Sequence, residues 1–316
     1  MKSLIKVKDI LRDFRDVYHA KMLSNRLERA YGAPLIIIGM HRSGTSLVTQ
    51  LLRQCGAYYG FILDGNSEAV EFVRLNNDLL GLIGSTWDSC TESFCFNDPK
   101  TVRHVRGYLI RNRHHLWSHF FKEFGRDGIE DIHYPRVPDK PLLNLFTLNW
   151  PATEKKARVW GWKDPRTTLT LPIWLELFPH ASVIHVIRNG IDVALSLWNR
   201  CQKSGIGYPQ CLDLNHNFDL WEFYVKQGLH WRHLLKTRYL EIKYEELLAN
   251  PFLRIQEIMS FAGLHIDKVE VLAKQIDTEK LCIPRQQTDR DLVNWALKNK
   301  LFQQLGYEKD VLATVG

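Results

Sequence analysis

The chain has 316 residues and a formal net charge of +7, from 42 Lys and Arg against 35 Asp and Glu. Hydrophobic residues make up 45% of it and aromatic residues 11%, which argues against a disordered chain, and 19 Gly and 12 Pro exclude a collagen-like or Pro-rich one. The charge fits a basic surface that keeps the protein soluble as well as it fits a site for an anionic ligand. The basic residues are scattered rather than gathered in a dense run, so we expect no nucleic-acid partner.

The N-terminal segment predicts an amphipathic helix within residues 1–32. Its apolar residues, from Leu4 to Tyr18, recur at a spacing of three or four. The segment lacks the apolar core of a signal peptide, and no apolar run approaches the roughly 20 residues of a membrane span. We therefore expect no integral membrane segment and a cytoplasmic location.

Short runs of apolar and β-branched residues predict the strands of a parallel sheet. The runs lie at 34–39, 158–162, 182–188 and 239–244; the second is weaker, and the last is more polar and so nearer an edge. Helical patterns follow at 44–55, 190–200 and 251–262. For the last helix, Asn250 supplies the N-cap, Pro251 the first position and Gly263 the stop. Strands alternating with helices predict a three-layer α/β fold with a central parallel sheet, as one domain over residues 1–316.

Residues 85–150 interrupt this pattern and are rich in His, Arg and aromatic residues. We interpret them as a helical insertion or cap over the sheet, on the side of an acceptor. His114, His115 and His119 could be metal ligands by their spacing, but surface or lid positions are the more common use of such histidines. No cysteine pair follows a zinc spacing; Cys90 and Cys95 could close a small disulfide loop, although unpaired thiols are the expectation. We predict no metal site.

The sharpest motif lies directly between the first predicted strand and its helix. Residues 39–46 read GMHRSGTS, which keeps the glycine spacing of the P-loop pattern G-x-x-x-x-G-K-[ST]. Such glycines let the backbone wrap an anion, and the following helix N-terminus adds partial positive charge. Thr45 stands where the P-loop has its Lys, which removes the clamp on a γ-phosphate, and Arg42 supplies a cation instead. The loop therefore favours a ligand with a 5′ phosphate group over a triphosphate.

Residues 42–46 resemble the 5′ phosphosulfate loop of the sulfotransferases that use 3′-phosphoadenosine 5′-phosphosulfate (PAPS). In that family, an Arg at the end of a later strand and a Ser eight residues on bind the 3′ phosphate; Arg188 and Ser196 have that spacing. Tyr244 begins a Tyr-Glu-Glu-Leu stretch similar to the one that closes over the adenine. The three elements follow the family's order between about residues 33 and 264. The resemblance implies a donor site formed by His41, Arg42, Ser43, Gly44, Thr45, Ser46, Arg188, Ser196 and Tyr244.

The resemblance also implies a P-loop-like fold and transfer of a sulfuryl group from PAPS, without a metal, to an acceptor hydroxyl or amine. Leu47 stands where cytosolic small-molecule members carry an adenine-stacking Trp, and their Lys-Thr-His stretch is not found. Residues 161–166 (GWKDPR) instead resemble bacterial and Golgi-type carbohydrate and protein sulfotransferases. We therefore expect a small-molecule or glycan acceptor, with a sugar hydroxyl as the first choice.

Sulfuryl transfer needs a base for the acceptor proton and cations for the leaving phosphate. We expect Arg42 and the loop amides to neutralise that phosphate. Lys163, at a strand end, is the expected second cation, and a salt bridge to Asp164 is its structural alternative. Protein-tyrosine and heparan-type members use a Glu soon after the first helix, which implies Glu68 as the base. Glu71, expected on the same helix face, is the alternative, and a first-turn Glu that only stabilises its helix is another.

Two functions from other classes remain open. A nucleotide kinase or other P-loop phosphotransferase needs a Lys at position 45 and a Walker-B Asp; Thr45 replaces the first, and no convincing candidate exists for the second. A binding-only module would keep both phosphate sites without the base.

Overall fold

The computed structural model describes residues 28–29, 32–60, 63–89, 159–204, 209–265, 267–277 and 290–309. The predicted N-terminal helix and the predicted insertion therefore lie outside the described residues, except for residues 28–29, 32 and 85–89. Cys90 and Cys95 also lie outside them, whereas Cys201 and Cys211 are buried free thiols. Within the described ranges, no helix is both long enough and apolar enough to cross a membrane.

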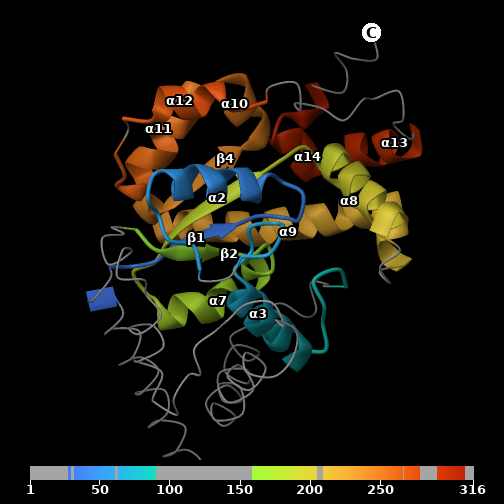
Figure 1. Ribbon diagram of the computed structural model, residues 1–316. Helices are drawn as coiled ribbons and strands as arrows, with labels where there is room; N and C mark the ends of the chain where they lie inside the picture. The colour runs from blue at the N-terminus through green and yellow to red at the C-terminus, as the bar shows by residue number, and fades with distance from the viewer. Residues whose placement is uncertain are drawn as a thin grey trace, which may run out of the picture.

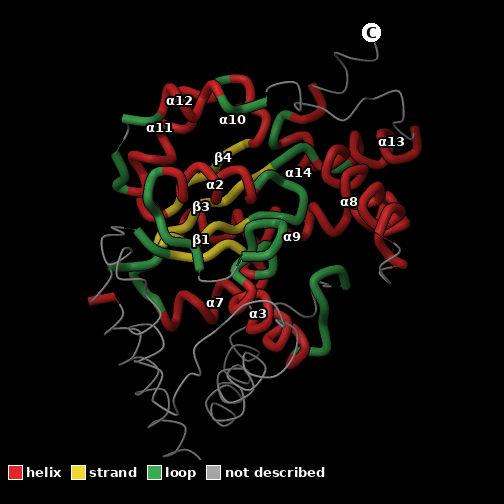
Figure 2. Tube along the Cα trace, viewed as in Figure 1, coloured by secondary structure: helices red, strands yellow, loops and turns green. Residues whose placement is uncertain are grey.

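Four parallel strands form one sheet in the order β2-β1-β3-β4 (Figures 1 and 2). The strands are β1 (Leu35–Ile38), β2 (Gly161–Lys163), β3 (Ser182–Ile187) and β4 (Tyr239–Lys243). All four predicted runs become strands, the weakest run is the shortest strand, and β4 lies at an edge as predicted. β2 lies on one side of β1 and β3 lies on its other side, so the direction in which strands are added reverses at β1. The carboxyl ends of β1 and β3 therefore form the switch point at which ligands bind in open α/β sheets.

Helices cover both faces of the sheet, which makes the predicted three layers (Figure 1). Along β1, Leu35 and Ile37 face one helical layer while Ile36 and Ile38 face the other. This burial on both faces explains why the strand is uniformly apolar. One layer holds α2 (Thr45–Gln54), α10 (Tyr244–Ala249), α11 (Pro251–Ala262) and α12 (Val269–Lys274). The other holds α3 (Val70–Leu82), α7 (Thr167–Leu177), α8 (Gly190–Ser204), α9 (Leu214–Leu235), α13 (Arg290–Lys298) and α14 (Lys300–Gln304).

The helix termini follow their sequence signals. Pro251 is the first residue of α11, and Gly263 ends it in the left-handed conformation with φ 67°. Asn250 holds the N-cap position, but its side chain makes no capping hydrogen bond. The long helix α9, which the sequence analysis did not predict, is capped by Asp213, whose carboxylate accepts hydrogen bonds from backbone N–H groups of its first turn.

Candidate active site

The loop between β1 and α2 has a backbone that requires glycine at both ends. Gly39 has φ 144° and Gly44 has φ 92°. A Cβ atom on Gly44 would lie 2.2 Å from Cδ2 of Tyr244, and one on Gly39 would lie 2.4 Å from the carbonyl oxygen of Val186. β3 and α10 thus pack directly against the loop, which confirms its tight, P-loop-like conformation.

The N–H groups at the start of α2 are available to a ligand. The amides of Gly44, Thr45 and Ser46 donate to no described residue. They open a ten-residue helix, whose N-terminus carries partial positive charge. The buried hydroxyl of Ser43 also lacks a hydrogen-bond partner among the described residues. This part of the loop can therefore bind an anion.

The second predicted phosphate motif meets the loop directly. Arg42 donates from Nε to Oγ of Ser196 at 2.9 Å. Arg188 donates from Nη1 to the backbone oxygen of Arg42 at 3.2 Å. These contacts join residues 154 and 146 positions apart in the sequence. The two anion sites predicted from separate strands are therefore adjacent.

Arg188 is held in place by its neighbours. Its Cζ lies 4.6 Å from the ring centroid of Tyr244, and its Nη2 lies 3.6 Å from the carboxylate of Asp192. Its Nε is buried and has no partner among the described residues. Because the ring of Tyr244 also packs against Gly44, all three predicted donor elements meet at one place.

Arg200 is a further cation of this group that the sequence analysis missed. It lies four residues after Ser196 in α8, a spacing that puts the two residues on the same helix face. Arg42 is an exposed residue, and partial desolvation, followed by the charges of Arg200 and Arg188, lowers the pKa of its guanidinium. Neither Arg42 nor Arg200 forms an ion pair with a described residue. Positive charge therefore accumulates beside the loop, and the i+4 relation to Ser196 was the signal for it.

Glu68 precedes α3 rather than lying inside it. Oδ1 of Asp64 accepts hydrogen bonds from the N–H groups of Asn66 and Glu68, both at 2.8 Å. This turn places Ser67 in the left-handed region, at φ 60°, so the helix begins only at Val70. The expectation that Glu68 and Glu71 share a helix face is therefore wrong, and the side chain of Glu71 lies outside the described residues.

The carboxylate of Glu68 lies between two cations. Its Oε1 is 3.4 Å from Nζ of Lys163, and its Oε2 is 3.2 Å from Nη1 of Arg166. Only 5% of Glu68 and 1% of Lys163 are exposed. Burial raises the pKa of Glu68, and it lowers the pKa of Lys163, although each residue's charge favours the ionised form of the other. The alternative bridge from Lys163 to Asp164 is not formed, because Asp164 pairs with Arg166 at 2.9 Å.

The carbonyl oxygen of Asn66 connects this pair to the phosphate loop. It accepts hydrogen bonds from Oγ of Ser46 at 2.5 Å and from Nζ of Lys163 at 2.7 Å. Ser46, Lys163 and Glu68 therefore belong to one hydrogen-bonded group, although Ser46 and Lys163 are 117 positions apart in the sequence.

Asp164 is anchored from the opposite side by Asn76. Nδ2 of Asn76 donates to Oδ2 of Asp164 at 2.7 Å, while its Oδ1 accepts from Thr170 and Trp174. Asn76 is fully buried and fully bonded, so it fixes the end of β2 against α3 and α7. In the part of the chain that the structure describes, no three His, Cys, Asp or Glu side chains are grouped so that they could hold a metal ion.

The predicted donor residue His41 turns its ring toward an aromatic neighbour. The ring lies 4.6 Å from that of Trp87, and Nε2 has no partner among the described residues. Burial, followed by the charges of Arg166 and Lys163, lowers the pKa of His41 well below its usual value. The imidazole is therefore neutral at neutral pH and lies close to both groups of cations.

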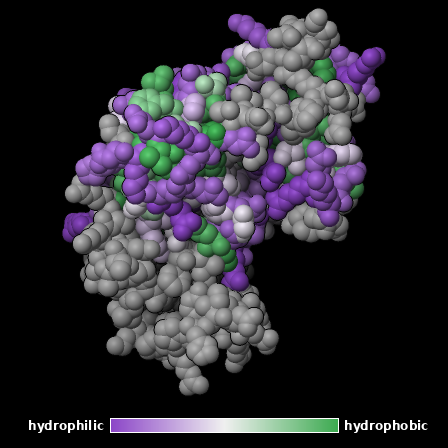
Figure 3. Space-filling view, turned by 45° about the horizontal axis from the view of Figure 1, so that its top comes forward, coloured by the Kyte–Doolittle hydropathy of each residue, from purple (hydrophilic) through white to green (hydrophobic). Residues whose placement is uncertain are grey.

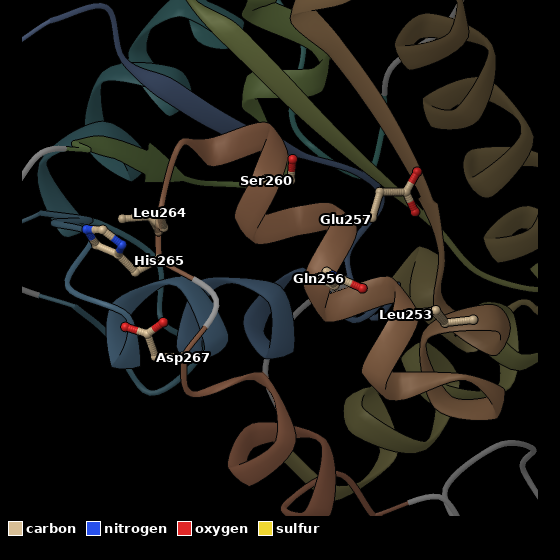
Figure 4. Close-up of a pocket in the computed structure, with 7 residues that line it drawn as sticks. All are labelled: Leu253, Gln256, Glu257, Ser260, Leu264, His265 and Asp267. Atoms are coloured by element: carbon tan, nitrogen blue, oxygen red, sulfur yellow. The ribbon is translucent and has the colours of Figure 1, made fainter.

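A pocket of about 620 Å³ lies away from these residues, along α11 and the segment that follows it (Figure 4). Leu253, Gln256, Glu257, Ser260, Leu264, His265 and Asp267 line it. Leu253, which lines it, is an exposed apolar residue, as are Phe252 on α11 and Val271 on α12. Among the residues coloured by hydropathy in Figure 3, hydrophobic patches interrupt a largely hydrophilic surface. None of the predicted site residues lines this pocket.

The chain matches the model of a known protein family. A sequence model described as "Sulfotransferase family" matches residues 34–268. This range contains every residue of the candidate site, from Gly39 to Tyr244. An uncharacterized protein of Aquifex aeolicus (strain VF5) is 24% identical over 235 residues, which is 73% of this chain. The chain spans about a quarter of the length of that relative.

Two solved structures resemble the chain at low similarity. The sulfotransferase domain of the Synechococcus PCC 7002 olefin synthase has a TM-score of 0.45 and 16% identity, over 83% of this chain and 86% of that one. A sulfotransferase from Alicyclobacillus acidocaldarius has a TM-score of 0.45 and 13% identity, over 83% and 88%.

Proposed function

Because the chain belongs to the sulfotransferase family, we propose that it transfers a sulfuryl group from PAPS to a hydroxyl or amine of a small-molecule or glycan acceptor. The observation that carries the proposal is the contact between the two anion motifs, Arg42 to Ser196 and Arg188 to Arg42. A donor with phosphate groups on the 5′ and 3′ positions of one ribose needs two adjacent anion sites. A nucleotide with phosphates at the 5′ position alone needs only one.

The residues of the site fit the donor. The amides of residues 44–46 and the unpartnered hydroxyl of Ser43 suit the 5′ phosphosulfate. Arg188 and Ser196 suit the 3′ phosphate, and Arg200 lies one helical turn beyond Ser196. The positive charge that Arg42 and Arg200 leave unpaired within the described residues supports an anionic ligand here.

We assign the role of general base to Glu68. As general base, its carboxylate would take the proton of the acceptor while the acceptor oxygen forms a bond to sulfur and the bond from sulfur to the 5′ phosphate oxygen breaks. The raised pKa of Glu68 makes it a stronger base than an exposed carboxylate. Lys163 and Arg166 orient that carboxylate and keep it ionised. Arg42 and Lys163 would stabilise the charge that develops on the phosphate.

The acceptor we propose first is a sugar hydroxyl. This choice rests on the His-, Arg- and aromatic-rich composition of residues 85–150, most of which lie outside the described residues. The phosphotransferase alternative receives no support from the site. Asp164 follows β2 as a Walker-B Asp would, but its carboxylate already binds Arg166 and Asn76.

Titration calorimetry with three nucleotides tests this proposal. We expect adenosine 3′,5′-bisphosphate to bind more tightly than 5′-AMP and ATP. Arg188→Ala should weaken the bisphosphate by about 10- to 150-fold, the usual worth of a charged hydrogen bond, and leave 5′-AMP nearly unaffected.

Arg254→Ala, on the surface helix α11, is the matched control and should change neither affinity. Equal weakening of both nucleotides by Arg188→Ala would place Arg188 outside the 3′ site. ATP binding more tightly than the bisphosphate would favour a phosphotransferase.

A further inference from the structure

The peptide unit between Arg188 and Asn189, at the turn from β3 to α8, is held at both of its polar ends. Nε1 of Trp221 donates to the carbonyl oxygen of Arg188 at 2.9 Å. The N–H of Asn189 donates to Oε1 of Glu245 at 2.7 Å. Because the two bonds oppose rotation of this peptide, they fix the direction in which the side chain of Arg188 leaves the backbone.

Glu245 is itself held by the C-terminal part of the described chain. Its second oxygen, Oε2, accepts a hydrogen bond from the hydroxyl of Tyr307 at 3.1 Å. The carboxylate therefore bridges the turn at Asn189 and Tyr307, which lies 62 positions after Glu245 in the sequence. Tyr307 is only 3% exposed, so its hydroxyl has little freedom to turn away.

The segment around Tyr307 is fastened to the same region. Nζ of Lys243, at the end of β4, donates to the carbonyl oxygen of Leu305 at 2.8 Å and lies 5.6 Å from the ring centroid of Tyr307. The ring of Tyr307 also packs edge-on against Trp221, with 6.4 Å between the centroids. The two side chains that hold the Arg188–Asn189 peptide, Trp221 and Glu245, therefore share Tyr307 as a neighbour.

We propose that Glu245 and Tyr307 are positioning residues for Arg188, so that the segment 300–309 sets the affinity of the site for a 3′ phosphate. The inference rests on the proposed function, because it concerns the nucleotide that Arg188 binds. Neither side chain touches the ligand in this proposal. Glu245 acts through the backbone of Asn189, and Tyr307 acts through Glu245.

Tyr307→Phe tests the proposal in the full chain, since it removes one hydroxyl and keeps the ring. The measurement is the ratio of the affinities for adenosine 3′,5′-bisphosphate and 5′-AMP, by titration calorimetry. We expect Tyr307→Phe to weaken the bisphosphate by about 2- to 10-fold, the range for one hydrogen bond, and to leave 5′-AMP unchanged. Glu245→Gln should act in the same direction and supplies the test if Tyr307→Phe does not fold.

Two comparisons separate positioning from general stability. In the Arg188→Ala background, Tyr307→Phe should cause no further loss, because residues that act through one group are not additive. Tyr239→Phe is the matched control: it removes another tyrosine hydroxyl, bonded to His185 at 2.6 Å, and should leave the affinity ratio unchanged.

An unchanged ratio in Tyr307→Phe, or a loss that persists in the Arg188→Ala background, would overturn the positioning role while the proposed function stands. A wild-type protein that shows no preference for the bisphosphate would contradict the proposed function itself, and with it this inference.

Discussion

At the scale of single residues, the site combines burial with opposite charge. A buried carboxylate or ammonium is costly unless a partner compensates it, and removal of one partner leaves the other charge unpaired. Glu68 and Lys163 are both almost fully buried and compensate each other, with Arg166 as a third member. The ionised form of the proposed base therefore depends on the cations around it.

Replacement of Glu68 tests its proposed role as the base. Glu68→Gln keeps the shape of the side chain but cannot accept the proton, so kcat for sulfate transfer should fall by about 10²- to 10⁴-fold. The affinity for adenosine 3′,5′-bisphosphate should change little. Glu71→Gln, in the first turn of α3, is the control and should be mild. If Glu71→Gln is inactive while Glu68→Gln keeps most of its activity, the base is assigned to the wrong residue.

The pH dependence of kcat gives a second test at this scale. A general base works when it is deprotonated, so activity should be lost as the pH falls through the pKa of Glu68. Burial raises that pKa, which places the acid limb of the profile at higher pH than for an exposed Glu. Lys163→Met removes a cation that favours the carboxylate, so it should move the limb to still higher pH. A limb that Lys163→Met leaves in place, or moves to lower pH, would argue against Glu68 as the titrating base.

At the scale of elements, the phosphate loop depends on the helix packed against it. Gly44 combines a positive φ with the ring of Tyr244 at its side, and that ring also supports Arg188. A change in the loop should therefore affect the 3′ site as well as the 5′ site.

Gly44→Ala and Gly56→Ala form a matched pair for this coupling. Both glycines have nearly the same φ, 92° and 91°, but a Cβ on Gly56 meets nothing within 4 Å. Each variant should lose about 1–3 kcal/mol of unfolding free energy to backbone strain. Only Gly44→Ala should also weaken adenosine 3′,5′-bisphosphate strongly, because Tyr244 must move. Denaturant unfolding and calorimetry measure the two effects, and equal nucleotide binding by both variants would contradict the coupling.

At the scale of the whole molecule, the proposed donor site joins elements from both sides of the switch point. β1 supplies the loop, β3 supplies Arg188, and β2 supplies Lys163. A ligand that contacts all three elements should raise the free energy of unfolding by about 2.7 kcal/mol when its free concentration is 100 times its Kd.

Metal chelation tests whether side chains or a metal ion stabilise the negative charge that develops on the leaving phosphate. Because Arg42 and Lys163 are proposed to stabilise the developing charge, EDTA should leave both sulfate transfer and the nucleotide-induced rise in Tm intact. Loss of transfer in EDTA that magnesium restores would contradict this and favour phosphoryl transfer.

Features that depend on neighbouring residues could be predicted from the amino-acid sequence alone. The apolar run at 34–39, the glycine spacing of residues 39–46 and the Pro251 to Gly263 signals predicted β1, the loop and α11. The resemblance to the PAPS-using sulfotransferases, carried by the eight-residue step from Arg188 to Ser196, implied a pair whose Ser side chain meets the loop. Each of these signals lies within one short segment, where local residue preferences and spacing determine the local structure.

Contacts between side chains that are distant in the sequence depend instead on the packing of the folded molecule. The turn closed by Asp64 put Glu68 ahead of α3, and the end of β2 gave it Lys163 as a partner, 95 positions away. Arg42 reached Ser196, and Tyr307 reached Glu245, through the packing of helices on the sheet. Spacing along the chain does not specify such contacts, because they depend on how whole elements are ordered in the sheet and layered over it.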